Sequence, residues 1–262
     1  MKKRTIVFIH GLWIHASSWQ PWMNFFQQQG YETLNPGWPG DAPSVAECRA
    51  NPQAIANRGV TEIADSFANT IASLSVPPIL IGHSFGGLIV QVLLGRGIAA
   101  AGIAIDPAPM KGVWQLPFSA LKASFPVLGN PSNFRKSVSL SFNQFRYGFA
   151  NAVPEEEAKE LYNRWTIPAP GRPLFQAATA SFAGSETKVN TANRTRGPLL
   201  ITGGEDDHIA PPVLGRASLK KYNSSVITEF KLFDARGHSL IIDHGWKEVA
   251  DYAYVWLNRQ GF

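Results

Sequence analysis

Short apolar runs bounded by turn residues recur near both ends of this chain. Such runs are typical of strands that are buried on both faces of a sheet. Longer stretches with apolar residues at helical spacing lie between several of them. The predicted strands are Thr5 to Ile9, Glu32 to Asn35, Ile79 to Ile81, Gly102 to Ile105, Leu199 to Thr202 and Val226 to Leu232. The predicted helices are Asn57 to Leu74, Gly87 to Arg96 and Trp246 to Asn258.

This alternation predicts an α/β fold with a mostly parallel sheet of about six strands, covered by helices on both faces. It stops between the fourth and fifth predicted strands, where prolines are frequent and helix-like pieces begin, such as the one at Pro154. Proline followed by acidic residues is typical of a helix N-terminus. We therefore expect a core formed by residues 1–106 and 198–262, and an inserted helical cap over residues 107–197.

The composition is that of a globular protein, with 45% apolar and 16% charged residues in 262. No apolar run approaches the roughly 18 residues that a membrane span requires. The basic start is followed by an apolar run that is broken at His10-Gly11, which is too short for a secretory signal. We expect a cytoplasmic protein without a membrane span. Its lone cysteine, Cys48, excludes an internal disulfide.

The net charge of +5 lies in the predicted cap, because residues 106–197 hold 11 basic and 6 acidic side chains. These charges are dispersed and accompany no nucleic-acid motif, so we expect no nucleic-acid partner. A solvated cap surface is the preferred interpretation, and weak attraction to anionic substrates or lipid headgroups is the alternative. The cap aromatics Trp114, Phe118 and Phe125 are expected in a pocket or in the core of the cap.

A candidate nucleophile follows the third predicted strand. Gly82-His83-Ser84-Phe85-Gly86 fits the pattern G-x-S-x-G of a nucleophile elbow, a strained strand-to-helix turn that presents one serine hydroxyl. The flanking glycines would let neighbouring chain pass close to the strained residue. The pattern therefore predicts Ser84 as a catalytic nucleophile.

A serine nucleophile needs a histidine base and an orienting acid. Among six histidines, His238 lies in a glycine-containing loop after the last predicted strand, in the chain order serine, acid, histidine that the hydrolase version of this fold requires. The preferred acid is Asp207, in a Gly-x-x-Asp-x-x-x-Pro arrangement that begins at Gly204. Asp206 and Asp106 are the alternatives.

The developing oxyanion would be bound by backbone N–H groups of Phe85 and of Leu12, in the loop after the first strand. Apolar and aromatic side chains are expected to bind the substrate. The residues predicted for this role are Trp13, His15, Trp114, Phe142 and Trp165.

Taken together, these motifs resemble the α/β-hydrolase superfamily. His10-Gly11, the elbow around Ser84, Gly204-x-x-Asp207 and Gly237-His238 stand in that family's order. Because the sequence opens directly on the His-Gly strand, it looks most like the short branch of plant hydroxynitrile lyases and small methyl esterases. The lyases carry a small polar residue where Gly11 stands and a lysine near the histidine, and this chain has neither. The resemblance therefore implies acyl hydrolysis rather than cyanohydrin cleavage.

These observations predict a serine hydrolase that cleaves a small to medium, apolar carboxylic ester or lactone through an acyl-enzyme, without a metal or organic cofactor. The same triad also serves perhydrolysis and carbon–carbon bond cleavage, which sequence barely separates from esterase action. A ligand receptor that keeps the triad without turnover is the alternative from another class.

Overall fold

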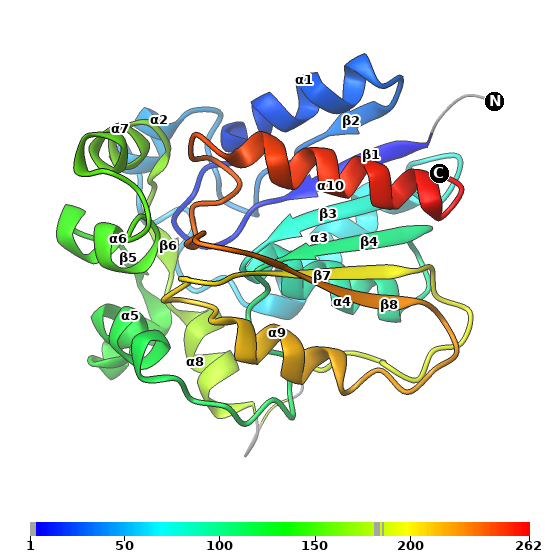
Figure 1. Cartoon of the computed structure of the whole chain (residues 1–262). Coiled ribbons are helices and arrows are strands. Elements are labelled where there is room, and N and C mark those ends of the chain that lie inside the picture. Colours follow the sequence, from blue (N-terminus) through cyan, green and yellow to red (C-terminus); the bar gives the residue numbers. More distant parts are fainter. Residues whose placement is uncertain (1–3, 181–183, 185) are drawn as a thin grey trace.

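The computed structural model describes residues 4–180, 184 and 186–262. Within them, six parallel strands form one sheet in the order β2-β1-β3-β4-β7-β8 (Figure 1). The strands are β1 (Thr5–Ile9), β2 (Glu32–Leu34), β3 (Ile79–His83), β4 (Ala101–Ile105), β7 (Leu199–Gly204) and β8 (Thr228–Phe233). The predicted α/β class and the six predicted strands are confirmed.

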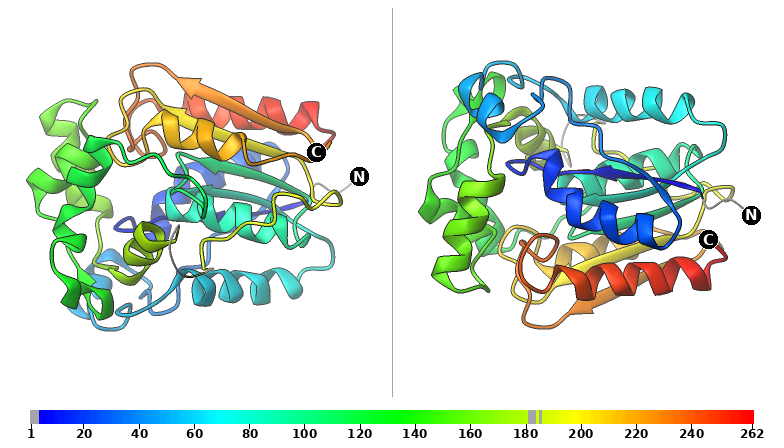
Figure 2. Two further views of the ribbon diagram at one scale, coloured as in Figure 1. Left: turned by 90° about the horizontal axis from the view of Figure 1, so that it is seen from below. Right: turned by 90° about the horizontal axis from the view of Figure 1, so that it is seen from above.

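Helices cover both faces of this sheet, as predicted. Its face toward α1 and α10 buries Ile6 and Phe8, whereas Val7 and Ile9 pack with the helices of the other face. Figure 2 shows the two layers from opposite sides. The covering helices are α1 (Gln20–Gln28), α3 (Val60–Ala72), α4 (Phe85–Gly95), α9 (Pro212–Leu219) and α10 (Trp246–Arg259). Apolar runs form the central strands because both of their faces are buried.

Two of these helices were not predicted from the pattern. Helix α9 contains Gly215 and has no strong apolar repeat. Helix α1 does place the buried Trp22 and Phe26 four residues apart, and the prediction overlooked this spacing in a short, glutamine-rich stretch. Boundaries also shift: the helix predicted from Gly87 begins at Phe85, and the strand predicted from Val226 begins at Thr228. Apolar spacing does not mark where a hydrogen-bonded ladder starts.

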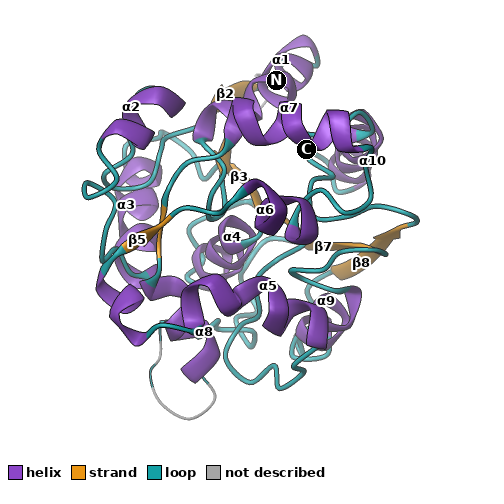
Figure 3. Ribbon diagram, turned by 90° about the vertical axis from the view of Figure 1, so that its left-hand side faces the viewer, coloured by secondary structure: helices purple, strands orange, loops and turns teal. Residues whose placement is uncertain are grey.

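A helical cap lies between β4 and β7, at the carboxyl ends of the strands (Figures 1 and 3). Helices therefore interrupt the alternation of strands and helices in this stretch, and α7 starts after Pro154 with three glutamates, as expected. The division into a core and a cap domain stays a prediction. A small antiparallel strand pair within this stretch was not predicted. The elements are α5 (Phe118–Leu128), a 3-10 helix η2 (Pro131–Arg135), β5 (Ser137–Val138), α6 (Phe142–Gly148), α7 (Glu155–Trp165), β6 (Ala169–Pro170) and α8 (Arg172–Thr179).

The cap is tied to the loop that follows β1. Ile14 forms an antiparallel bridge with Thr166. The Arg49 guanidinium, on α2 (Val45–Ala50), donates to the carbonyl oxygens of Tyr162, Asn163 and Thr166 at 2.8–3.1 Å. The end of α7 is thereby fixed beside the β1 loop. None of the helices in the described part of the chain is long and apolar enough to cross a membrane.

Candidate active site

Ser84 occupies the turn between β3 and α4 in a strained conformation. Its φ of 57° and ψ of −122° lie outside the regions that non-glycine residues ordinarily adopt. Two backbone hydrogen bonds hold it there: its N–H donates to the Ile105 carbonyl at 2.9 Å, and its carbonyl accepts from the Ala108 N–H at 3.0 Å. The end of β4 and the segment after it therefore maintain the strained serine.

The two flanking glycines permit this turn because neighbouring backbone passes too close to them for a side chain, as the motif predicts. A Cβ atom on Gly82 would lie 2.3 Å from the Gly86 carbonyl oxygen, and one on Gly86 would lie 2.1 Å from the Ile9 carbonyl oxygen. Both distances are far below van der Waals contact. The elbow is packed against the end of β1 so tightly that neither position accepts a side chain.

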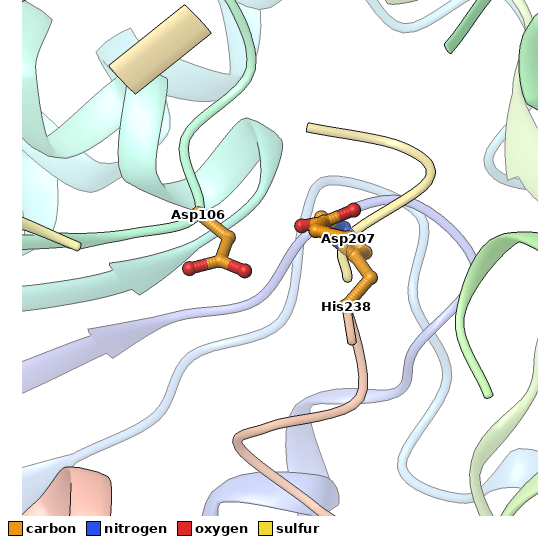
Figure 4. A group of neighbouring side chains, drawn as sticks. All are labelled: Asp106, Asp207 and His238. Atoms are coloured by element: carbon orange, nitrogen blue, oxygen red, sulfur yellow. The ribbon is translucent and has the colours of Figure 1, made fainter. Parts of the chain in front are cut away.

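His238 lies in the loop after β8, and its ring is held by Asp207 from the loop after β7. The distance from His238 Nδ1 to Asp207 Oδ2 is 2.6 Å, and both side chains are fully buried (Figure 4). The other carboxylate oxygen accepts N–H groups of Ile209 at 2.7 Å and Ala210 at 2.8 Å. His238 Nε2 has no hydrogen-bond partner among the described residues. The ring is therefore oriented through one nitrogen while the other remains available.

His83 links this histidine to the elbow. Its Nε2 lies 2.9 Å from the His238 carbonyl oxygen, and the two ring centroids are 4.4 Å apart. Burial, together with the neighbouring His238, holds the pKa of His83 well below its usual value. A neutral His83 ring donates its Nε2–H to that carbonyl and ties the His238 backbone to the residue that precedes Ser84.

The loop after β1 lies against the serine. A Cβ atom on Gly11 would lie 2.7 Å from Ser84 Cβ and 3.3 Å from its Oγ. Neither the Leu12 N–H nor the Phe85 N–H takes part in a turn or loop hydrogen bond within the described ranges. The prediction that these two N–H groups bind an oxyanion is therefore compatible with their hydrogen bonding.

Comparison with known proteins agrees with this arrangement. The model of the alpha/beta hydrolase family matches residues 6–252. This chain belongs to the alpha/beta hydrolase family. An uncharacterized abhydrolase domain-containing protein of Dictyostelium discoideum is 22% identical over 98% of this chain, which spans only 26% of that relative's length.

Solved structures share the fold of this alpha/beta hydrolase. A monoacylglycerol lipase from Paleococcus ferrophilus has a TM-score of 0.72 and 21% identity, with 98% of this chain and 94% of that chain covered. A methylesterase from Arabidopsis has a TM-score of 0.68 and 15% identity, with 98% and 99% covered. At these identities the likeness establishes the fold alone.

The hydrolase contains three acidic residues that were considered as partners of His238. Asp207 makes the contact, whereas Asp206 is exposed and its backbone carbonyl accepts from the Asn151 side chain. Asp106 lies at the end of β4, where it accepts the Thr202 hydroxyl at 3.2 Å and the Gly204 N–H at 3.0 Å.

Asp106 and Asp207 form a buried, hydrogen-bonded carboxyl pair. Burial, and then the charge of Asp207, raises the pKa of Asp106 well above its usual range. Burial alone would raise the pKa of Asp207 as well, but the interactions with His238 and Asp106 hold it below its usual value. Asp106 is therefore the protonated member and donates to Asp207. Ligand atoms of these two residues and His238 lie within 4.8 Å of one another, but the His238–Asp207 hydrogen bond already uses the atoms that a metal would need.

A second buried pair lies behind the β1 loop and was not found from the sequence. His10 Nε2 is 2.9 Å from Asp41 Oδ2, and the two side chains are 1% and 3% exposed. Trp38 stacks on the His10 ring and donates its Nε1–H to the His10 carbonyl at 3.1 Å. Asp41 and Trp38 lie in an irregular segment that carries no periodic or motif signal, so sequence reasoning had no means of placing them.

A cavity of about 170 Å³ opens beside Ser84. Its wall is formed by the elbow, the segment after β4, α5, α8 and the loop before α9. The lining residues are Ser84, Phe85, Ala108, Pro109, Val113, Trp114, Gln115, Leu116, Pro117, Ala120, Leu121, Ser124, Leu128, Leu174, Ala177, Ala178, Ile209, Ala210 and Leu214. The wall contains no ionisable side chain.

Of the five residues predicted to bind substrate, Trp114 lines this cavity and the other four do not. Trp13 donates its indole N–H to the Val138 carbonyl at 2.9 Å. His15 caps the 3-10 helix η1 (Ala16–Trp19) and contacts the Ala42 carbonyl. Phe142 packs on Tyr162, and Trp165 is buried beneath Arg164. These four aromatic rings instead support the cap and the β1 loop.

The expectation that the cap aromatics lie in a pocket or in the core of the cap is confirmed for Trp114 and was wrong for Phe118 and Phe125. Phe118 is 80% exposed, Phe125 70% and Trp114 59%. Trp114 does contribute to the cavity wall, but the two phenylalanines lie on the outside of α5. Their apolar character alone gave no indication of which way α5 would turn.

Proposed function

We propose that this protein is a serine esterase that hydrolyses small to medium carboxylic esters or lactones through an acyl-enzyme. The observation that carries the proposal is the buried Asp207–His238 hydrogen bond, with His238 Nε2 unpartnered beside the strained serine turn. In this scheme His238 takes the proton of Ser84 as Oγ attacks the carbonyl. The same histidine then activates the water that releases the acyl group.

Asp207 has two roles in this scheme. Its Oδ2 keeps the proton of His238 on Nδ1, so that Nε2 can act as the base. Its charge also stabilises the imidazolium that forms once the Ser84 proton is transferred. The N–H groups of Leu12 and Phe85 would bind the oxyanion. No step requires a metal or an organic cofactor.

The cavity beside Ser84 favours an uncharged substrate. Its wall is built mainly from apolar side chains, with Gln115 and Ser124 as its polar members besides the nucleophile. A charged acyl group would lose hydration there without gaining an ionic partner. We therefore expect apolar acyl groups to be accepted, and dicarboxylic or amino-bearing ones to be rejected.

The test combines covalent labelling with turnover. A fluorophosphonate should modify Ser84 stoichiometrically, and nitrophenyl esters of increasing acyl length should be turned over steadily. Ser84→Ala and His238→Ala should lower kcat by roughly 10³-fold or more, since only binding and oxyanion stabilisation would remain. Ser124→Ala is the matched control, because this second serine of the cavity wall should be neither labelled nor required.

Two results would count against the esterase. Full activity of Ser84→Ala would refute the nucleophile. Stoichiometric labelling of the wild type without turnover of any ester in the series would instead indicate a binding protein.

A further inference from the structure

Helix α5 has an apolar surface on two sides. Ala120, Ser124 and Leu128, spaced four residues apart, face the cavity beside Ser84. Phe118 and Phe125, seven residues apart, lie on the outside and are 80% and 70% exposed. A helix that covers a core ordinarily presents polar side chains to water on its outer face. Helix α5 does not.

The outer apolar face continues into the mouth of the cavity. Trp114 and Leu116, in the loop before α5, line the cavity and are 59% and 73% exposed. Leu121 also belongs to both surfaces, being a lining residue that is 47% exposed. We call these residues the mouth patch: Trp114, Leu116, Phe118, Leu121 and Phe125. Contiguous exposed apolar surface of this kind marks an interaction site, and this one lies where a substrate would enter.

Positive charge accompanies the mouth patch. Lys122 stands on α5 within helical contact range of both Phe118 and Phe125, and its ammonium lies over the Tyr147 ring at 4.1 Å. Residues 107–154 contain no Asp or Glu. Their basic residues are Lys111, Lys122, Arg135, Lys136 and Arg146. Helix α5 packs against η2 and α6, so that Arg135 and Arg146 belong to elements that adjoin it.

We propose that the mouth patch docks on an anionic lipid surface, with Phe118 and Phe125 inserted among the acyl chains and Lys122 at the headgroups. Aromatic side chains beside basic residues on one helix face suit this position at a membrane interface. A second copy of the chain is a poorer occupant, because a twofold contact through α5 would bring the same lysines together. The cavity mouth would then open into the lipid layer.

Figure 3 views the molecule from the cap side, with α5 in front. Helix α10 lies on another side, against the sheet, and carries Val255, which is 55% exposed. Val255→Ser therefore removes a similar exposed apolar side chain away from the proposed docking face. It serves as the control for the double variant Phe118→Ser/Phe125→Ser. Neither phenylalanine lines the cavity, so turnover of a soluble ester should be unchanged in the double variant.

The binding test is flotation of the full chain with vesicles of phosphatidylcholine alone, or of phosphatidylcholine mixed with phosphatidylglycerol. The wild type should float with the mixed vesicles and bind less as salt is raised, because Lys122 and its neighbours are screened. The double variant should lose about tenfold or more in partitioning, given the apolar area that two phenylalanines bury. Val255→Ser should float like the wild type, and Lys122→Gln should weaken the preference for anionic vesicles.

Three outcomes would overturn the proposal. The first is that the wild type does not float with mixed vesicles. The second is that the double variant floats as well as the wild type. The third is that the wild type sediments as a dimer whereas the double variant sediments as a monomer. In the last case, a second copy covers the mouth patch.

The further expectation that substrate enters the cavity from the lipid layer rests on the proposed esterase function. The double variant should turn over an ester dispersed in vesicles more slowly than the wild type, at equal turnover of a soluble ester. Ser84→Ala should still bind vesicles. Vesicle binding without any ester turnover by the wild type would therefore contradict the esterase and leave the docking surface standing.

Discussion

At the scale of single residues, the site depends on two positions that have no part in bond making. Gly11 brings the β1 loop against Ser84, where a Cβ atom would lie 2.7 Å from that of the serine. Asp106 fixes Asp207 from behind by a hydrogen bond that requires a proton on the Asp106 carboxyl. Both would act on the proposed catalytic groups by holding Ser84 and Asp207 in position.

Replacing Asp106 tests whether activity depends on the protonated, neutral form of its carboxyl group. Asp106→Asn should keep kcat within a few-fold, because an amide can donate to Asp207 while its oxygen accepts from Thr202 or Gly204. Asp106→Ala removes every one of these bonds and should lower both kcat and stability, the latter by about 1–3 kcal/mol. Esterase kinetics and urea unfolding of both variants provide the measurement. If the asparagine variant were as impaired as the alanine variant, an ionised Asp106 would be required.

Gly11→Ala tests the close approach of the β1 loop. The added methyl group would collide with Ser84 Cβ, so that the Leu12 N–H would be displaced from the oxyanion position. We expect kcat to fall by about 10²-fold or more, with a smaller change in KM, because the lost interaction belongs to the transition state. Steady-state kinetics on a short acyl ester would measure it, and unchanged kcat would remove Leu12 from the proposed oxyanion hole.

At the scale of elements, the cap and the β1 loop are joined by a few polar contacts. Arg49 on α2 donates to carbonyl oxygens at the end of α7, and Thr166 bridges to Ile14 beyond the oxyanion loop. These carbonyls lie at the end of α7, where helix acceptors commonly lack an intrahelical donor, although the Tyr162 carbonyl also accepts the Thr166 N–H and hydroxyl. The guanidinium therefore bonds several acceptors of the helix end at once. The cap position and the geometry of the β1 loop are therefore coupled.

Arg49→Ala should weaken this coupling. We expect a loss of about 1–3 kcal/mol in the free energy of unfolding, because the guanidinium bonds several carbonyl oxygens. Arg259→Ala is the matched control, since Arg259 on α10 makes an exposed ion pair with Glu229 on β8. Its removal should cost less than about 1 kcal/mol. Urea unfolding compares the two, and equal losses would show that Arg49 does not fasten the cap.

At the scale of the whole molecule, burial of ionisable groups at the ends of the strands makes folding depend on pH. His83 is fully enclosed, and His238, Asp207 and His10 are the groups that act on its charge. Its pKa is low in the folded state and returns to about 6.5 on unfolding. Below that pH the unfolded chain binds one more proton, so His83 lowers stability progressively as the pH falls.

His83→Gln should flatten this dependence. Its side-chain amide can still donate to the His238 carbonyl but does not titrate. The free energy of unfolding of the wild type should decline more steeply between pH 7 and pH 5 than that of His83→Gln, whatever their difference at pH 7. Asp106 acts in the opposite direction in both proteins. Because its pKa is raised in the folded state, its contribution to the free energy of unfolding declines as the pH rises above about 3.9, the ordinary pKa of aspartate. Parallel curves for the two proteins would contradict the assignment to His83.

Much of the fold and of the candidate site follows from local features of the chain. The central strands are apolar because both faces are covered, and the elbow glycines are dictated by contacts under 2.5 Å that no side chain could make. Helix α9 was missed because its sequence lacks a strong apolar repeat, whereas α1 was missed although Trp22 and Phe26 stand at helical spacing in its short sequence. The sequence favoured Asp207 but left Asp206 and Asp106 as alternatives, because the partner of His238 is the carboxylate that reaches it in space.

The sequence by itself determined the α/β class, the strand order along the chain, the inserted cap and the strained turn at Ser84. All of these depend on short-range periodicity or on a steric pattern of a few residues. Tertiary structure alone decided that Asp106 lies beside Asp207, that His10 pairs with Asp41, and that Phe118 and Phe125 face outward. Each of these depends on which surfaces of distant segments meet, and apolar or acidic character does not encode that direction.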